Sequence, residues 1–357
     1  MNSKKAFKYL SMYLLLVINE ACWERLPIFD DKQKPPGSDT TQDWLAVWGN
    51  NSDNIWIGGK TLQHYSSGAW RDETSFLSAF NGHYNLRAIY GNVENHILVG
   101  SDNFMKGEAI YEKLGTADWS RMEDPFSEPY KLGMERRSIW HDGTNTWMAG
   151  RCGCHMCVAD WPTGYSRFEI EDTNAPWFTH NDVKYCTTGA SEMENDNKYN
   201  IMSGIWGINA DLVWTTGFFG AKNLGPYGII FQWRKTGGGV TNGMWNEEFL
   251  YEKPLYAIWG FDQDNIWAVG GEGSILHRDG IHWSAERYGD KNLNAIWGHS
   301  ATNIWAVGDG GTILHFDGSS WKQQPSPTEN NLRGVYGSGP HDVWIVGDKG
   351  TVLMRVP

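Results

Sequence analysis

One motif, L-x-A-I-W-G followed by D-N-I-W-A-V-G, recurs seven times along the chain, with its clearest copies beginning at Leu255 and Leu293. The first run carries an aromatic residue in each copy, at Trp48, Tyr90, Trp140, Trp206, Trp259, Trp297 and Tyr336. The second run carries a partner position, at Trp56, Leu98, Trp147, Trp214, Trp267, Trp305 and Trp344. The two positions lie eight residues apart in every copy except the third, where they lie seven apart. Self-similarity at a period of roughly 40 residues predicts a radial or solenoidal array of identical units.

Each unit reads as four short strands. In the best copy these are residues 293–299, 303–309, 311–318 and 319–325, rich in β-branched and aromatic residues and bounded by Gly, Asp and Asn. Asp279-Gly280 and Asp317-Gly318 lie between the third and fourth runs, where a tight hairpin turn favours an Asx-Gly pair. Fourth strands are expected to begin at Trp70, Trp119, Trp245, Trp283 and Trp321, with residues 165–168 as the degenerate third copy.

The seventh copy ends after three strands, at residue 355. Residues 23–27 (Trp-Glu-Arg-Leu-Pro) read like residues 321–325, so we expect them to supply the missing strand and to remove the open sheet edges. The sequence therefore predicts an all-β fold, a seven-bladed β-propeller of four-stranded antiparallel blades whose last blade is closed by the N-terminal strand. The expected blades are residues 45–85, 86–136, 137–200, 201–254, 255–292, 293–331, and 332–357 plus 23–27. Together they form one domain, 22–357.

The beginning of the chain has the pattern of an export signal. Lys4, Lys5 and Lys8 precede an apolar run over residues 9–18, which is too short to span a membrane. We expect a signal peptide over residues 1–21 and no transmembrane span. Cys22, preceded by the small Ala21, resembles the lipid-acceptor cysteine of bacterial lipoproteins, although the preceding residues 19–20 depart from that motif. Lipidation and simple secretion both stay open, which places the protein in the periplasm, at the outer membrane surface or outside the cell.

Charge limits the classes of partner. The net charge of −12 disfavours sequence-independent binding to nucleic acid or to an anionic membrane, because both need a basic surface. The sequence shows no marked pair of carboxylates for sugar hydrolysis and none of the common nucleophile, zinc-protease or phosphate-loop motifs. We therefore favour a protein without catalytic residues and without a cofactor, and its oligomeric state stays open.

Four of the five cysteines belong to one part of the repeat. Cys152, Cys154 and Cys157 crowd together with His155, and Cys186 follows in the same copy. Connections after the second and the fourth strand of a meander emerge on one face of the ring, so all four thiols can meet there. In an exported chain we favour disulfides among them. A zinc site formed by the same cysteines with His155 is the alternative.

The regular repeat is interrupted in copies two, three and four. The extra residues are 101–108, 151–157, 171–200 and 218–227, and by the same parity all of them project from one face. Loops on a rigid scaffold are where binding residues concentrate. The aromatic and histidine residues in these insertions are the candidate binding residues: Phe104, Trp177, Phe178, His180, Phe218 and Phe219. Packing of these aromatics onto the rim of the ring is the alternative.

Three histidines recur at one position of the repeat. His64, His277 and His315 each lie six residues before a fourth-strand Trp. Equivalent positions in different blades are spread around a ring, so we expect them to have a repeated structural role and not to form one site.

The repeat, as in AIWGFDQDNIWAVGGEGSILHRDGIHW, resembles the propeller repeats of exported bacterial proteins of the sialidase-like (Asp-box) and sortilin-like groups, and more weakly tectonin-type lectin propellers. These groups include scaffolds, lectins and enzymes. We predict an exported or lipid-anchored scaffold without catalytic activity that binds a protein or cell-envelope partner through the loop-rich face of blades two to four. A carbohydrate-binding propeller and a glycan-active hydrolase or lyase are the alternatives.

Overall fold

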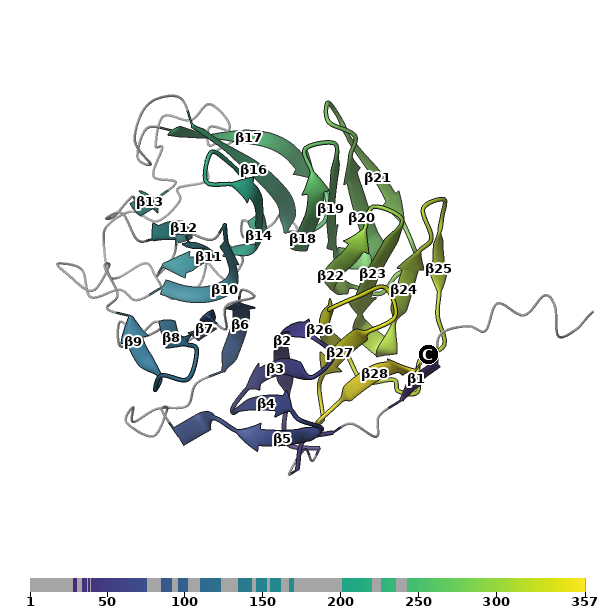
Figure 1. The fold of residues 1–357 in the computed structure, drawn as a ribbon. Helices are drawn as coiled ribbons and strands as arrows, with labels where there is room; N and C mark the ends of the chain where they lie inside the picture. Colours follow the sequence, from purple (N-terminus) through teal and green to yellow (C-terminus); the bar gives the residue numbers. More distant parts are fainter. Residues whose placement is uncertain are drawn as a thin grey trace, which may run out of the picture.

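The computed structural model describes residues 28–30, 34–36, 38, 40–75, 85–91, 96–101, 110–122, 134–142, 146–152, 155–161, 167–169, 201–219, 226–235 and 243–356. Within them, four-stranded antiparallel sheets are arranged around a common centre (Figure 1). No helix in these ranges is long and apolar enough to cross a membrane.

Six blades consist of four consecutive strands each. Blade 1 contains β2 (Trp44–Asn51), β3 (Asn54–Gly59), β4 (Leu62–Ser66) and β5 (Ala69–Asp72), and blade 2 contains β6 (Leu86–Gly91), β7 (His96–Ser101), β8 (Ile110–Leu114) and β9 (Ser120–Met122). Blade 3 contains β10 (Met134–His141), β11 (Thr146–Cys152), β12 (His155–Trp161) and β13 (Arg167–Glu169), and blade 4 contains β14 (Ile201–Asn209), β15 (Leu212–Phe219), β16 (Tyr227–Lys235) and β17 (Gly243–Tyr251). Blade 5 contains β18 (Leu255–Asp262), β19 (Asn265–Gly270), β20 (Ser274–Arg278) and β21 (Trp283–Arg287), and blade 6 contains β22 (Leu293–Ser300), β23 (Asn303–Gly308), β24 (Ile313–Phe316) and β25 (Trp321–Gln323). Short 3-10 turns, η3 (Gly271–Gly273) and η4 (Asp309–Gly311), follow β19 and β23.

The remaining sheet, here called the closing sheet, is a composite. It contains β26 (Leu332–Gly337), β27 (Val343–Gly347) and β28 (Val352–Val356), completed by β1 (Ile28–Asp30) from the other end of the chain. In its register Ile28 faces Val356 and Asp30 faces Met354. The prediction of seven blades with residues 23–27 as the closing strand is therefore corrected to six blades of four consecutive strands and a closing sheet completed by Ile28–Asp30.

The closing strand was predicted in the wrong place because a phenylalanine, Phe29, stands where the repeat pattern has a tryptophan. Trp321 on β25 packs edge-on against Trp267 of blade 5, with ring centroids 5.7 Å apart. At the corresponding place on β1, Phe29 packs edge-on against Trp305 of blade 6, at 5.6 Å and 81°. Phe29 thus provides the contact that the sequence pattern assigned to Trp23, and residues 23–27 lie outside the described part of the chain.

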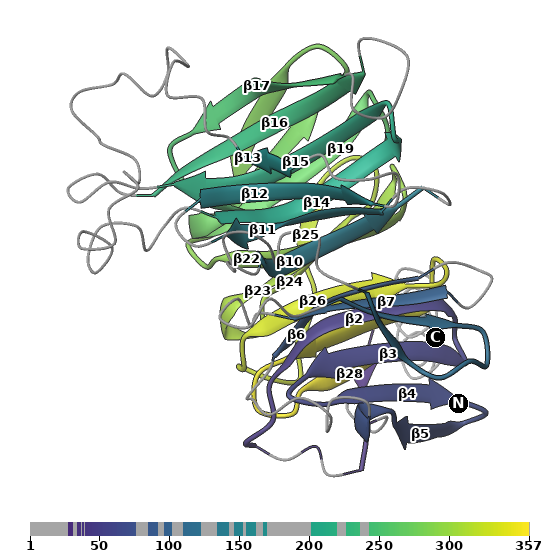
Figure 2. The same ribbon diagram turned by 90° about the vertical axis from the view of Figure 1, so that its left-hand side faces the viewer.

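Within each sheet the strands run in succession from the middle of the ring to its rim. Figure 2 shows β2, β3, β4 and β5 in this order. The expected starts of the fourth strand at Trp283 and Trp321 are confirmed. Elsewhere the start differs by one or two residues: β5 begins at Ala69, β9 at Ser120, β13 at Arg167 and β17 at Gly243. Gly280 and Gly318, in the turns before β21 and β25, have positive φ angles of 95° and 93°.

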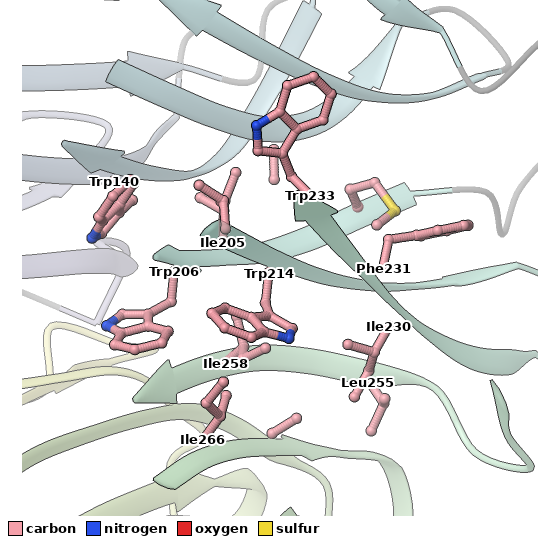
Figure 3. Packing of buried hydrophobic residues seen from close by; sticks show 14 of the residues in the cluster. Trp140, Ile205, Trp206, Trp214, Ile230, Phe231, Trp233, Leu255, Ile258 and Ile266 are labelled. Carbon is pink, nitrogen blue, oxygen red and sulfur yellow. The ribbon is translucent and has the colours of Figure 1, made fainter. Parts of the chain in front are cut away.

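Neighbouring blades are joined by a common apolar core. Figure 3 shows one such region, in which Trp140 and Ile205 lie near Trp206 and Trp214, together with residues of blade 5. Trp214 and Trp233 are completely buried there. Indole rings bury a large apolar area each, so most of the Trp content contributes to stability between blades.

In blades 2, 4 and 5 and in the closing sheet, the glycine after the first-strand aromatic has a direct steric cause. A Cβ atom on Gly91 would lie 2.6 Å from the six-membered ring of Trp48 in the preceding blade. Gly260 has the same relation to Trp206, at 2.7 Å, and Gly337 to Trp297, at 2.6 Å. The W-G pair of the motif is therefore an inter-blade contact, in which the indole of one blade lies on the backbone of the next.

Candidate binding site in the central channel

The innermost strand of every sheet carries a β-bulge at the same place. In each case the register of the sheet skips the second residue of the repeat motif. The skipped residues are Leu45, Arg87, Arg137, Ser203, Tyr256, Asn294 and Arg333. A bulge re-aims the side chain of the residue that it inserts. The rest of the motif is almost constant, whereas this position carries aliphatic, cationic, hydroxyl, aromatic and amide side chains.

These bulge residues line a cavity of about 270 Å³ in the middle of the ring. Its wall comes from β2, β6, β10, β14, β18, β22 and β26, and includes the first-strand aromatics. A cavity just below the usual range of roughly 300–1,000 Å³ for small-molecule pockets fits one or two side chains of a partner better than a large ligand.

The bulges mark one end of this channel. They lie near the start of each inner strand, so they share a face with the connections that enter the inner strands and with those between second and third strands, because adjacent strands are antiparallel. We call this the entry face, and the end of the channel that opens there the mouth. The end of β15 at Phe219 and the start of β16 at Tyr227 lie on the same face.

On one side of the mouth the cationic charge is balanced. Arg333 donates from Nε and from one terminal nitrogen to the two carboxylate oxygens of Asp348, both at 2.8 Å. Asp309 lies 3.8 Å from the same guanidinium and also accepts from Nδ2 of Asn294 at 2.9 Å. The Asp348 carboxylate raises the pKa of Arg333 above its usual value. These groups form a closed polar network.

The other side of the mouth is built by blades 2 to 4. Arg87 and Arg137 occupy the bulges of β6 and β10, which pack side by side, and both line the cavity. Ser203 follows on β14, where its hydroxyl donates to the carbonyl of Leu255 at 2.8 Å and thereby links blades 4 and 5. The arginines were not singled out from the sequence. The signal that could have found them is the chemical variety of a single position within an otherwise constant motif.

Two of the predicted aromatic binding residues are described. Phe218 packs edge-on against Tyr256, a bulge residue of the channel, with centroids 5.5 Å apart. Phe219 stacks on Tyr227 at 6.0 Å. Phe218, near the end of β15, therefore contacts the channel wall at the mouth. Phe104, Trp177, Phe178 and His180 lie outside the described residues.

The cysteine segment is mainly a hairpin. Cys152 ends β11 and Cys157 lies within β12, and their cross-strand positions face His155 and Gly150 respectively. The expected loop over 151–157 is therefore wrong, because strands β11 and β12 continue through most of it. Cys22, Cys154 and Cys186 lie outside the described residues, so the pairing stays a prediction. No cluster of three or more metal-ligating side chains occurs in the described ranges.

The repeated histidines stack on the second-strand tryptophans, which confirms their structural role. The ring of His64 lies 3.8 Å from that of Trp56, and the ring of His315 lies 4.2 Å from that of Trp305. Asn54 Oδ1 accepts from both Trp56 Nε1, at 3.0 Å, and His64 Nε2, at 2.7 Å. An amide oxygen can only accept a hydrogen bond, so His64 carries its proton on Nε2.

Asn303 has the same relation to Trp305, at 3.0 Å, and to His315, at 2.9 Å. His277 also stacks on its tryptophan, Trp267, at 3.9 Å. These Asn-Trp-His units lie far from the channel mouth, on the second and third strands of their blades.

No protein-family model matches the sequence. No curated protein matches it either. The fold is similar to that of several solved propellers. The structure described as YCF48 bound to D1 peptide has a TM-score of 0.60 and 14% identity, and the match covers 93% of this chain and 96% of that one. YCF48 from Cyanidioschyzon merolae has a TM-score of 0.58 and 15% identity, covering 91% and 98%.

Two further propellers are similar over nearly the whole of this chain. The WD40 β-propeller domain of Doa1 has a TM-score of 0.62 and 11% identity, covering 92% of this chain and 97% of that one. The extracellular domain of the putative hybrid two component system BT4673 from B. thetaiotaomicron has a TM-score of 0.61 and 14% identity, covering 92% and 40%. At such identities the likeness shows the fold alone, and that fold is an all-β propeller.

Proposed function

We propose that this protein is a scaffold without catalytic activity that binds a protein partner through its entry face, over blades 2 to 4 and around the mouth of the channel. The observation that carries this proposal is the set of bulges: one position in a constant motif varies from blade to blade, and all of its copies converge on one cavity. Such variation is typical of one unique binding site on a repetitive scaffold.

Two further observations support a protein partner. Phe218, near the end of β15, contacts the channel wall through Tyr256. Propellers of the same fold include one solved with a peptide bound, YCF48 with D1 peptide. The lectin alternative has less support, because Trp48 and Trp140, at 4% and 7% exposure, offer little ring surface for stacking on sugars.

Export and anchoring through Cys22 belong to the same proposal. β1 is the outer strand of the closing sheet and begins beside the end of β28, on the face opposite to the mouth. Cys22 precedes Ile28 by six residues, so a lipid on it would hold that face within about 20 Å of a membrane surface. The mouth would then point away from the membrane.

Metabolic labelling with a fatty acid tests whether Cys22 is lipidated. We expect label on the wild-type protein and none on Cys22→Ser. An unlabelled wild-type protein would favour simple secretion.

Photo-cross-linking tests the binding face. A benzophenone amino acid at Leu45, a bulge residue at the mouth, should give a discrete cross-linked protein in native cells. The same residue placed at Ile281 is the control, since Ile281 is 79% exposed and lies in the β20–β21 hairpin of the opposite face. Equal cross-linking from both positions, or discrete products from Ile281 alone, would refute the proposed face.

A further inference from the structure

We propose that the central channel takes up an aromatic side chain of the partner, which packs against Trp259 on the inner strand of blade 5. This inference rests on the proposed function, because it names the group of the partner that enters the cavity from the mouth. Trp259 is one of the seven first-strand aromatics, all of which except that of Leu45's neighbouring strand are treated below by how they pack, and it lines the cavity of about 270 Å³.

The first-strand aromatics fall into two groups. Four tryptophans lie with the ring against the glycine of the next blade and are 4% to 7% exposed: Trp48, Trp140, Trp206 and Trp297. Three aromatics are half-buried: Tyr90, Trp259 and Tyr336. In the blade that follows each of these three, His141 replaces the glycine, or the nearest atoms to the glycine belong to other residues, as at Gly298 and Gly49. A ring that the next blade does not cover therefore keeps part of its surface in the channel.

A phenylalanine leaves Trp259 in this half-buried state. The atom nearest to a Cβ on Gly298 is Cζ of Phe261, at 2.5 Å. Phe261 thus occupies the place that a first-strand tryptophan has at four other junctions. Trp259 packs against Trp297 instead, with ring centroids 6.4 Å apart and an angle of 52° between the rings. Trp259 is consequently the one first-strand tryptophan that presents indole surface to the cavity.

The surface that these rings present is apolar. The Nε1 atom of Trp259 is buried, so the exposed part of its indole consists of carbon atoms. Tyr336 lies on the other side of Trp297, with ring centroids 5.6 Å apart. Its hydroxyl accepts a hydrogen bond from the indole of Trp48, and burial raises the pKa of this hydroxyl. Trp259 and Tyr336 therefore border one stretch of the channel wall with ring carbon.

An aromatic side chain matches this wall better than a cation or a sugar. Aromatic rings pack edge-on or offset at centroid separations of about 4.5–7 Å, the arrangement that Trp297 already has with both of its neighbours. The described residues that line the cavity include no carboxylate, which a cationic side chain would need as its counter-charge. A sugar would need free hydrogen-bonding groups beside the ring, whereas the polar atoms of Trp259 and Tyr336 are buried or already bonded.

Fluorine NMR of the full chain labelled with fluorotryptophan tests the inference, with N-acetyl-phenylalanine amide as the probe. The conservative variant Trp259→Phe identifies the resonance of Trp259. Trp283→Phe identifies that of a half-buried tryptophan on the outer strand of the same blade. We expect the probe at millimolar concentration to shift the Trp259 resonance in a saturable way and to leave the Trp283 resonance in place. N-acetyl-leucine amide, N-acetyl-lysine amide and maltose should shift it much less.

A pair of matched variants measures the contribution of the indole. Trp259→Leu should weaken binding roughly three- to tenfold, followed on the signals of the probe, since one aromatic pair contributes about that factor. Trp283→Leu should leave binding within about twofold. The shift of the wild-type resonance decides the question if Trp259→Leu does not fold.

Three results would overturn the inference. The first is a Trp259 resonance that the probe does not shift. The second is an equal shift with N-acetyl-leucine amide, and the third is a larger shift with N-acetyl-lysine amide or maltose.

The proposed function and this inference fail in different ways. If cross-linking from Leu45 captures a partner but the probe does not shift the Trp259 resonance, the entry face stands as a docking surface and the aromatic group is wrong. If neither occurs, both are wrong.

Discussion

Lowering the pH from 7 to 4.5 should destabilise the propeller through two half-buried histidines, His64 and His315. His64 and His315 stack on Trp56 and Trp305, and burial lowers the pKa of each to about 4. In the unfolded chain their pKa returns to about 6.5. Between these values the unfolded chain binds protons that the folded protein does not. The contribution of the two neutral histidines to stability is therefore complete above pH 6.5 and is lost as the pH falls toward 4.

The magnitude follows from the size of the pKa shift. The pKa of each histidine is about 2.5 lower in the folded protein than in the unfolded chain. At about 1.36 kcal/mol for each pH unit, this difference can change the free energy of unfolding by at most about 3.4 kcal/mol per histidine. Both rings keep contact with solvent, and solvent screening reduces this to roughly 1–2 kcal/mol each. We expect the free energy of unfolding to fall by about 2–4 kcal/mol between pH 7 and pH 4.5 from these two groups together.

Urea denaturation followed by Trp fluorescence at pH 7, 6, 5 and 4.5 measures this dependence. The double variant His64→Gln/His315→Gln should be less stable at pH 7, because it loses both stacks, and should show a distinctly flatter pH dependence. His341→Gln, at an exposed histidine, is the control and should retain the wild-type slope. The same slope in the wild type and the double variant would show that these histidines do not titrate as their burial implies.

Three further substitutions test the packing between blades. Phe29→Ala, at a side chain 5% exposed, should cost about 3–5 kcal/mol of unfolding free energy and weaken closure of the ring, measured by urea denaturation. Gly91→Ala should cost about 1–3 kcal/mol because its Cβ would lie 2.6 Å from the ring of Trp48, whereas Gly339→Ala, with open space around its Cβ, should cost much less. Glu248→Ala should cost about 2–4 kcal/mol, since it removes the acceptor of two indole N–H groups and of a guanidinium at 2.9 Å; thermal unfolding within about 1 °C of the wild type would contradict this assignment.

Much of the fold could be predicted from the sequence because the repeat encodes contacts between neighbouring units. The Trp–Gly pair, as in Trp206 followed by Gly207, reflects packing that recurs around the ring, so it recurs in the sequence. The turn at Asp317-Gly318 was predictable for a local reason: the Asp317 carboxylate accepts from the backbone of Ser319 and Ser320. Contacts that recur in the repeat and turns defined by two adjacent residues, such as Asp317-Gly318, could therefore be predicted at the right positions.

Contacts made only once around the ring were harder to predict. The closing strand needs an aromatic residue against Trp305, and Phe29 satisfies that need as well as a tryptophan, so matching Trp23 to Trp321 selected the wrong segment. The expected loop over 151–157 was wrong for a related reason, because pairing between β11 and β12 extends a hairpin beyond the constant motif.

The candidate site was predicted only in part. The alternating direction of the strands predicted that the insertions lie on one face. Of their candidate aromatic residues, Phe218 lies beside the channel wall, against Tyr256. The bulges were missed because L-x-A-I-W reads as regular alternation, and only the skipped register shows that the x residue is re-aimed. Arg87 and Arg137 therefore looked like ordinary strand residues.

The most direct test of partner binding at the entry face is hydrogen exchange of the full chain, measured with and without the partner that is cross-linked from Leu45. We predict slower exchange at the bulges of blades 1 to 3, around Leu45, Arg87 and Arg137, and no change in the β20–β21 hairpin at Ile281 on the opposite face. Protection confined to that hairpin, with none at the bulges, would contradict the assignment of binding to the mouth of the channel.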